Sequence, residues 1–191
     1  MLNLNKIRRK FPSLSRKDNE GNKIIYLDGP GGTQVPEIVI EGISRYYKSS
    51  NSNIHGEFIT SIETDKVMES MREKVSVFLG AENKDCISIG QNMTTLNFSL
   101  SRALSKIFKI GDEIIITELD HEANRGPWKL LEDKGIKIIE INLLSSGELD
   151  YNDFKRKINE KTVMVAMGMS SNALGTINDF EKVKKFIKNH N

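Results

Sequence analysis

The chain has 191 residues, of which 38% are hydrophobic and 28% are charged. This composition is typical of a soluble globular protein of one domain or slightly more, and it excludes a disordered chain. Lys and Arg total 28 against 26 Asp and Glu, with the two signs interspersed along the chain. The charge pattern therefore indicates neither nucleic acid nor an anionic membrane as a partner.

Cys86 is the only cysteine, which excludes an internal disulfide and a cysteine-rich metal site. Because Cys86 lies in a short apolar run, we expect a buried structural thiol. The first ten residues lack the apolar region of a signal peptide, and no run of about 18 apolar residues occurs. These features predict a cytoplasmic protein.

Residues 1 to about 62 differ from the rest of the chain and begin with a polar N-terminal stretch. They contain a short strand-like segment, 23–27, followed by the glycine-rich run Asp28-Gly-Pro-Gly-Gly-Thr33. This run lacks the spacing of a phosphate loop or a dinucleotide fingerprint, and Pro30 removes a donor. We therefore expect no nucleotide site here, and a domain boundary near residue 62.

From about residue 63 helical and strand-like segments alternate. The first helix has one apolar face and is expected to end at Gly80 and to pack on another element. The residues of that face are Val67, Met68, Met71, Val75, Phe78 and Leu79.

Strands are predicted at 86–89, 113–117, 136–141 and 162–167, with helices beginning near residues 92, 127, 150 and 179. The helix that contains Pro127 in its first turn is expected to run to Gly135. This alternation predicts an α/β fold of three layers with a mainly parallel sheet. Because no further strand follows the last helix, we expect the sheet to be incomplete on its C-terminal side.

Ligands of open α/β sheets collect at the carboxyl ends of the strands, and three turns there carry unusual polar residues. The first is Gly90-Gln91-Asn92-Met93-Thr94, which enters a helix. Free N–H groups at that helix start favour a phosphate, whereas simple capping by Asn92 or Thr94 explains the same residues.

The second turn contains Asp120 and His121, whose imidazole has a flat face for stacking on an aromatic ligand. The alternative is that Asp120 caps the next helix and His121 is only exposed. The start of an H-E-x-x-H zinc motif is broken by Arg125, and only His55 and His190 remain elsewhere, so we expect no metal site.

The third turn is 170–175, where the Asn172 amide is able to donate to a ligand oxygen, although Asn and Gly are also ordinary turn residues. No G-x-S-x-G elbow and no distinctive pair of carboxylates is present, so hydrolase chemistry has no residue support. The glycine fingerprint of a nucleotide-binding Rossmann domain is absent from the sequence, which argues against that fold.

Four segments together resemble one family, the class V aminotransferase and cysteine desulfurase group of fold-type I pyridoxal-phosphate (PLP) enzymes. They are 26–36 (Tyr-Leu-Asp-Gly-Pro-Gly-Gly-Thr-Gln-Val-Pro), 90–96 (Gly-Gln-Asn-Met-Thr-Thr-Leu), 111–124 with Pro127-Trp128, and 171–178 (Ser-Asn-Ala-Leu-Gly-Thr-Ile-Asn). The resemblance is strongest to the desulfurase-like branch and covers only the N-terminal portion of such enzymes. It implies that residues 63–191 are the N-terminal half of the PLP-binding large domain.

The resemblance also implies roles for single residues. Asn92 and Met93 match positions that hold the PLP phosphate, with Thr94 as a substitute hydroxyl because the usual Gly-Thr-Thr is absent. His121 matches the residue that stacks on the pyridine ring, and Asn172 the one that hydrogen-bonds the phenolic oxygen. The loop with Gly29, Gly31, Gly32 and Thr33 would lie on the substrate side.

The family's Schiff-base lysine, its Asp for the pyridine nitrogen and its mobile catalytic cysteine have no counterpart in these 191 residues. We therefore assign no catalytic residue and expect a partial chain of a transferase or lyase acting on a small amino acid. It would work as a homodimer or with a complementing C-terminal half. The alternative is a non-catalytic α/β binding module or a gene remnant.

Overall fold

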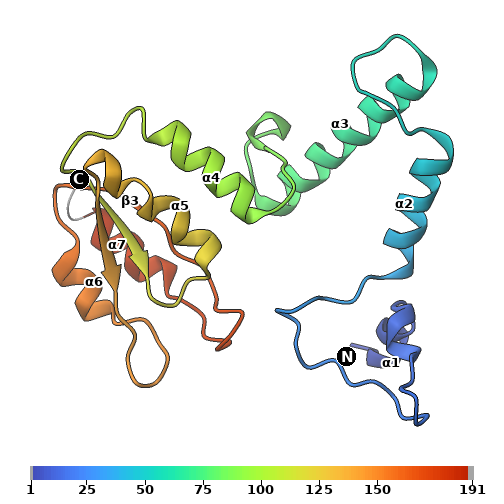
Figure 1. The fold of residues 1–191 in the computed structure, drawn as a ribbon, viewed down its shortest axis with the longest axis horizontal. Coiled ribbons are helices and arrows are strands. Elements are labelled where there is room, and N and C mark those ends of the chain that lie inside the picture. The colour runs from blue at the N-terminus through green and yellow to red at the C-terminus, as the bar shows by residue number, and fades with distance from the viewer. Residues whose placement is uncertain (1, 189–191) are drawn as a thin grey trace. The chain divides into compact units, whose positions relative to one another are not determined.

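A computed structural model describes residues 2–188 (Figure 1). The chain divides into two compact units, Met1–Ser88 and Ile89–Asn191. The boundary that the sequence suggested near residue 62 lies within a helix of the first unit, Ile59–Leu79. None of the described helices is long and apolar enough to cross a membrane.

The first unit is helical. It contains α1 (Leu4–Arg8), α2 (Glu37–Ser49) and α3 (Ile59–Leu79), with short 3₁₀ helices at Pro12–Ser15 and Lys84–Cys86. The expected strand at 23–27 is wrong, because only one isolated bridge forms there, between Lys17 and Lys23. Residues 24–27 have no neighbouring strand to pair with in the described chain, so they form no strand.

Polar side chains join α2 to α3. The Tyr46 hydroxyl lies 3.2 Å from Thr64 Oγ1, which in turn donates to the carbonyl of Ser50 at 2.9 Å. The Ser50 hydroxyl donates to the Glu63 carboxylate at 2.7 Å. These bonds fix the turn between the two helices, because each satisfies a group near a helix end.

Helix α3 ends as expected at Gly80, which has the left-handed conformation (φ 67°) that favours glycine. Its apolar face differs from the expectation. Val67, Phe78 and Leu79 are exposed, with Phe78 at 87%. Within the described residues this face therefore has no apolar partner at its C-terminal end.

The strand expected at 86–89 is also wrong. Cys86 closes a 3₁₀ helix, and Ile87 follows with extended torsion angles but joins no ladder. Among the strands of the described chain, none pairs with this segment, so it has the conformation of a strand without its hydrogen bonds. The same absence of covering structure leaves Cys86 exposed, which corrects the expectation of a buried thiol.

The second unit contains the sheet. Its strands are β1 (Glu113–Thr117), β2 (Lys137–Ile141) and β3 (Thr162–Val165), all parallel, in the order β2-β1-β3. Its helices are α4 (Met93–Leu104), α5 (Gly126–Lys129), α6 (Tyr151–Lys157) and α7 (Phe180–Lys188). The α/β fold with a parallel sheet is therefore confirmed.

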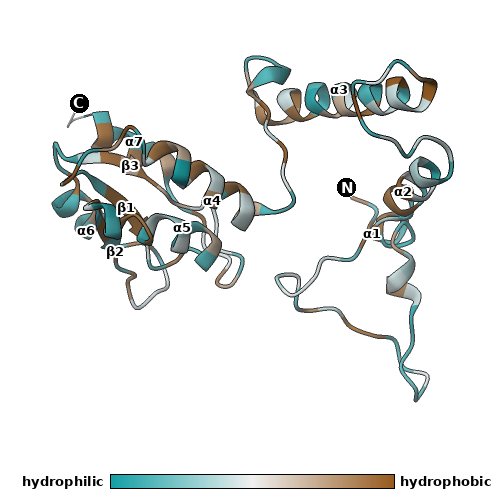
Figure 2. Cartoon of the chain, turned by 45° about the horizontal axis from the view of Figure 1, so that its top comes forward, coloured by the Kyte–Doolittle hydropathy of each residue, from teal (hydrophilic) through white to brown (hydrophobic). Residues whose placement is uncertain are grey.

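Alternating side chains of β1 pack into two apolar clusters, one on each face of the sheet. Ile114 and Ile116 pack with Trp128 of α5 on one face, where Leu104 of α4 also lies. Ile115 packs with Phe154 of α6 on the other face, in a cluster that α7 completes. Figure 2 shows hydrophobic colour along β1, as expected for a central strand buried on both faces. The unit therefore has three layers.

The segment after β1 is less regular than expected. Helix α5 has only four residues, and Leu131 then donates to Trp128 O three residues back, which tightens the chain into the 3₁₀ helix Glu132–Lys134. Gly135 ends it in the left-handed conformation (φ 80°). The prediction of one long α-helix is therefore wrong, because the segment is a short α-helix followed by a 3₁₀ helix. The two ends of the segment lie where they were predicted.

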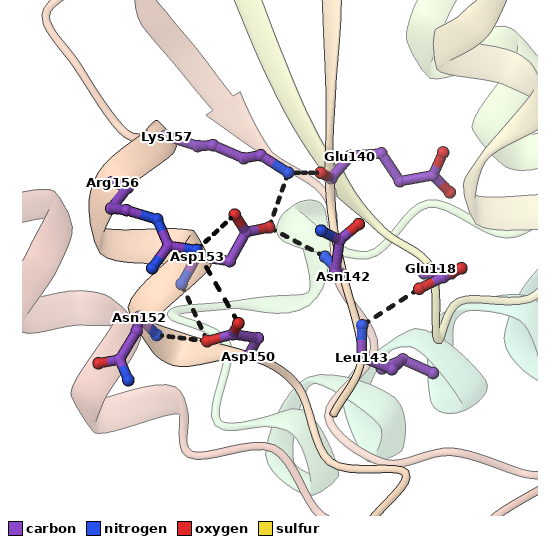
Figure 3. Close-up of polar contacts among 9 residues, drawn as sticks. All are labelled: Glu118, Glu140, Asn142, Leu143, Asp150, Asn152, Asp153, Arg156 and Lys157. Atoms are coloured by element: carbon purple, nitrogen blue, oxygen red, sulfur yellow. Dashed lines mark hydrogen bonds and ion pairs between the residues drawn. The ribbon is translucent and has the colours of Figure 1, made fainter. Parts of the chain in front are cut away.

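Asp153 of α6 ties this helix to the end of β2 (Figure 3). Its buried carboxylate accepts hydrogen bonds from Lys157 at 2.7 Å, the Asn142 N–H at 3.1 Å and Arg156 at 3.1 Å. Burial alone would raise the pKa of Asp153, but the hydrogen bonds from Lys157 and Asn142 outweigh burial and hold the pKa below its ordinary value.

Because the pKa of Asp153 is lowered in the folded chain, the free energy of unfolding depends on pH. Since the pKa of Asp153 is lower in the folded than in the unfolded chain, its contribution is full above about pH 4, the unfolded value, and is lost as the pH falls through the folded value. We expect Asp153→Asn to lower the free energy of unfolding at pH 7 by about 1–3 kcal/mol. The variant should also lose less stability than the parent between about pH 4 and pH 2. Urea titrations at several pH values measure both effects, and equal acid sensitivity of the two proteins would contradict this role.

Candidate functional site

A cavity of about 400 Å³ opens at the carboxyl ends of β1 and β3, beside the start of α4. Three segments of the second unit line it. The lining residues are Asn92, Met93, Thr94, Leu119, Asp120, His121, Ala123, Asn124, Gly168, Ser170, Ser171, Asn172 and Asn178. The five residues singled out from the three turns of the sequence, Asn92, Met93, Thr94, His121 and Asn172, are all among them.

The start of α4 provides hydrogen-bond donors. Asn92 is the N-cap, and its side chain accepts from the Thr95 N–H at 2.9 Å. Within residues 2–188, the N–H groups of Met93 and Thr94 donate to no acceptor. Asn92 therefore caps the helix, and the capping leaves two amides and the positive end of the helix dipole available to an anion.

His121 is held by the backbone that follows it. Its Nδ1 accepts from the Ala123 N–H at 3.1 Å and so caps the 3₁₀ helix Glu122–Asn124. The alternative in which Asp120 caps this helix is wrong, because His121 occupies that position. In the neutral imidazole the proton then lies on Nε2, and the exposed ring lines the cavity with a fixed orientation.

The third segment is a tight loop after β3. The buried Ser171 hydroxyl accepts from the N–H groups of Ala173 and Leu174, and the Ser171 N–H donates to Thr176 O at 2.9 Å. Gly175 allows the turn with a positive φ of 75°. Asn172 is exposed on this loop, and its side-chain amide bonds to nothing in the described chain. The amide is therefore available to a ligand.

Three further lining residues carry hydrogen bonds that the sequence did not reveal. Asp120, Asn124 and Asn178 connect the walls of the cavity to one another. The spacing of Asp120, Asn124 and Trp128 at intervals of four was the available signal, since such residues lie on one side of a helical segment. For Asn178 the sequence held no indication of a role except its position at the end of the matching segment 171–178.

The glycine-rich loop with Gly29, Gly31, Gly32 and Thr33 belongs to the first unit, Met1–Ser88, and its place on the substrate side stays a prediction. The loop is a turn in which the Gly31 N–H donates to Asp28 Oδ1 at 3.1 Å. A Cβ on Gly31 would collide with the Asp28 carboxylate, so the close approach requires glycine unless that side chain moves.

Acidic, histidine and cysteine side chains do not gather into a metal site within the described part of the chain. His55 lies in the first unit, where its backbone N–H donates to Asp65. His190 lies outside the described residues. The cavity itself offers backbone and amide donors, the flat imidazole of His121 and the Asp120 carboxylate.

Comparison with known proteins identifies the family. The family described as "Aminotransferase class-V" matches residues 25–191. The chain belongs to the class-V aminotransferases. A probable cysteine desulfurase of Vibrio cholerae is 34% identical over 186 residues, covering 96% of this chain and 46% of that protein. One of Streptomyces coelicolor is 33% identical with the same coverage.

Solved structures agree with this family assignment. The apo structure of a cysteine desulfurase from Thermococcus onnurineus matches with a TM-score of 0.86 and 31% identity, covering 100% of this chain and 46% of that one. The cysteine desulfurase CsdA from Escherichia coli matches with a TM-score of 0.82 and 26% identity, covering 99% and 47%. The resemblance seen in the sequence is confirmed, and this chain spans less than half the length of these class-V relatives.

PLP is the cofactor of this family of enzymes, as the resemblance implied. A more distant structure that matches with a TM-score of 0.78 and 18% identity is described with glycine covalently linked to the PLP cofactor. That match supports the fold alone. The donors of the cavity nevertheless suit PLP, because they pair an anion site at a helix start with a flat ring and a free amide.

Proposed function

We propose that this chain supplies the cofactor pocket of a PLP-dependent enzyme of the cysteine desulfurase type. The observation that carries the proposal is the convergence of three separate turns on one cavity at the carboxyl end of a parallel sheet. Each turn contributes a different kind of contact, and together the contacts match the parts of one aromatic phosphate.

The start of α4 would hold the phosphate. The Met93 and Thr94 amides, which have no acceptor in the described structure, point along the helix axis as every first-turn amide does. The Thr94 hydroxyl adds a donor in the place of the family's usual threonine pair. The helix dipole favours the negative charge, so the anchor needs no cationic side chain.

The other two turns would hold the ring. His121 would stack its imidazole on the pyridine, in the orientation that the hydrogen bond from Ala123 fixes. Asn172 would donate its free amide to the phenolic oxygen. When bound, PLP supplies an electron sink that stabilises a carbanion at the substrate's α-carbon, and these residues would orient it for that chemistry.

The substrate and the assembly are part of the same proposal. The names of the relatives support a small amino acid, with cysteine as the leading candidate. The chain would act as a homodimer or together with a complementing C-terminal half that brings the Schiff-base lysine. Residues 1–62 would be the arm with the substrate-side loop, and 63–191 the cofactor-binding part. The single exposed thiol is compatible with a reducing compartment, and we place the protein in the cytoplasm.

Binding of 4′-deoxypyridoxine 5′-phosphate tests the pocket. This PLP analogue has no aldehyde, so it does not react with surface lysines, and calorimetry measures its noncovalent affinity. We expect saturable binding to the parent chain, and binding about tenfold weaker to His121→Ala because a stacking contact is lost.

The matched control is His55→Ala, a histidine of the first unit outside the three segments that form the proposed pocket, and it should bind like the parent. Failure of the parent chain to bind the analogue would refute the pocket and favour a non-catalytic module. Equal weakening by both histidine substitutions would refute the stacking role of His121.

A further inference from the structure

Asp120 connects all the segments that form the cavity. Asp120 lies three residues after the end of β1, and its carboxylate accepts three hydrogen bonds: from Thr117 Oγ1 at 2.5 Å, Asn124 Nδ2 at 3.0 Å and the Gly168 N–H at 2.7 Å. Thr117 is fully buried and Asn124 is 8% exposed. Two donors close in sequence and one 48 residues away thus converge on one half-buried side chain.

The bond to Gly168 fixes the loop that carries Asn172. Gly168 is its first residue, and the Gly168 carbonyl accepts from Asn178 Nδ2 at 2.7 Å, so both ends of the loop are held at one point. A Cβ on Gly168 would lie 3.0 Å from Asp120 Oδ1, a tight contact that would push the carboxylate back by a few tenths of an ångström. Asp120 therefore adds a direct link between this loop and the segment after β1, beyond the pairing of β3 with β1.

The bond to Asn124 reaches the helix at the phosphate end of the cavity. Asn124 Oδ1 accepts from Asn97 Nδ2 of α4 at 3.3 Å, and the same Asn97 amide donates to Ala123 O at 2.9 Å. His121 lies between Asp120 and this pair in the chain. The residues on either side of His121 are therefore held by hydrogen bonds, and the imidazole itself accepts from the Ala123 N–H.

We propose that Asp120 is the positioning residue of this cavity, setting the His121 ring and the Asn172 amide at the spacing that an aromatic phosphate requires. The role rests on the proposed function, because it assumes that the cavity binds such a ligand. Asp120 acts through its neighbours, and an acceptor-only side chain suits the position because all three partners donate to it.

Two ligands separate this role from simple support of the fold. Inorganic phosphate should need only the start of α4, whereas 4′-deoxypyridoxine 5′-phosphate should need all three turns. We expect Asp120→Ala to bind the analogue about tenfold more weakly and to bind inorganic phosphate like the parent. A loss of folding would weaken both ligands together.

Asp120→Asn provides the conservative rescue. Its amide oxygen would still accept from Gly168 and Asn124, and its NH₂ group would face the Thr117 hydroxyl, which is able to accept. This variant should recover most of the affinity for the analogue. Asp133→Ala removes the same charge at an exposed position away from the cavity and serves as the matched control.

Hydrogen exchange of the Gly168 amide in the free protein provides a readout that needs no ligand. In Asp120→Ala the Gly168 amide hydrogen should exchange at least about tenfold faster than in the parent, because the carboxylate that accepts its hydrogen bond is gone. If the parent protects Gly168 but does not bind the analogue, the proposed function fails. If Asp120→Ala binds the analogue like the parent, or leaves the Gly168 exchange rate unchanged, the role of Asp120 is overturned.

Discussion

Phe154→Ala is expected to lower the free energy of unfolding by about 3–5 kcal/mol, the largest stability loss that we predict for a single substitution. The Phe154 side chain is fully buried against Ile115 and Ile141 of the sheet. Its ring lies 5.9 Å from that of Phe186, so the substitution removes an aromatic contact between α6 and α7 on this face. The cavity left behind would have helices on one side and a rigid sheet on the other, and neither collapses easily.

The only tryptophan of the chain makes the measurement direct. Trp128 is 1% exposed and packs on the opposite face of the sheet, so its fluorescence reports unfolding without touching the substituted site. A shift of the urea midpoint seen by Trp128 would show that both faces unfold together. Phe78→Ala, at a side chain 87% exposed in the first unit, should change stability by no more than about 0.5 kcal/mol. A Trp128 transition that does not move in Phe154→Ala would contradict a single cooperative sheet.

The sequence predicted the sheet well because its central strand is unambiguous. Three consecutive isoleucines between Glu113 and Thr117 require apolar contacts on both faces, and only a central strand covered on both sides provides them. The segment at 86–89 has a similar apolar character, yet it forms no strand. Apolar pattern predicts extended backbone, but a strand also needs a free neighbouring edge, and a sequence does not say where edges lie.

The candidate site shows the same division between local and distant effects. The turns with Asn92, His121 and Asn172 could be grouped in advance, because the carboxyl ends of parallel strands meet at one edge. The network of Asp120 could not, because its partner Gly168 lies 48 residues further along the chain and donates through its backbone. Backbone donors have no sequence signature, so only the folded chain reveals such a contact.

Asn92→Asp should separate phosphate binding from helix stability. Aspartate caps a helix as well as asparagine does, and its charge also interacts favourably with the helix dipole. The bond that the Asn92 side chain accepts from Thr95 is therefore retained, and stability should be unchanged or slightly higher. The same carboxylate would stand at the edge of the cavity beside the Met93 and Thr94 amides, where a bound phosphate would meet a like charge. Repulsion of about 1–4 kcal/mol per charge pair at about 4 Å predicts affinity for 4′-deoxypyridoxine 5′-phosphate about 100-fold lower.

The control for this substitution is the same change at a cap outside the cavity. Asn83 caps the 3₁₀ helix Lys84–Cys86 through the Asp85 N–H at 2.9 Å, so Asn83→Asp adds an equal charge in an equivalent role. It should bind the phosphate analogue like the parent. The analogue without its phosphate, 4′-deoxypyridoxine, should bind the parent and Asn92→Asp equally, because the added charge meets no anion. If Asn92→Asp kept its affinity for the phosphorylated analogue, the anion would bind elsewhere and the start of α4 would be only a capped helix.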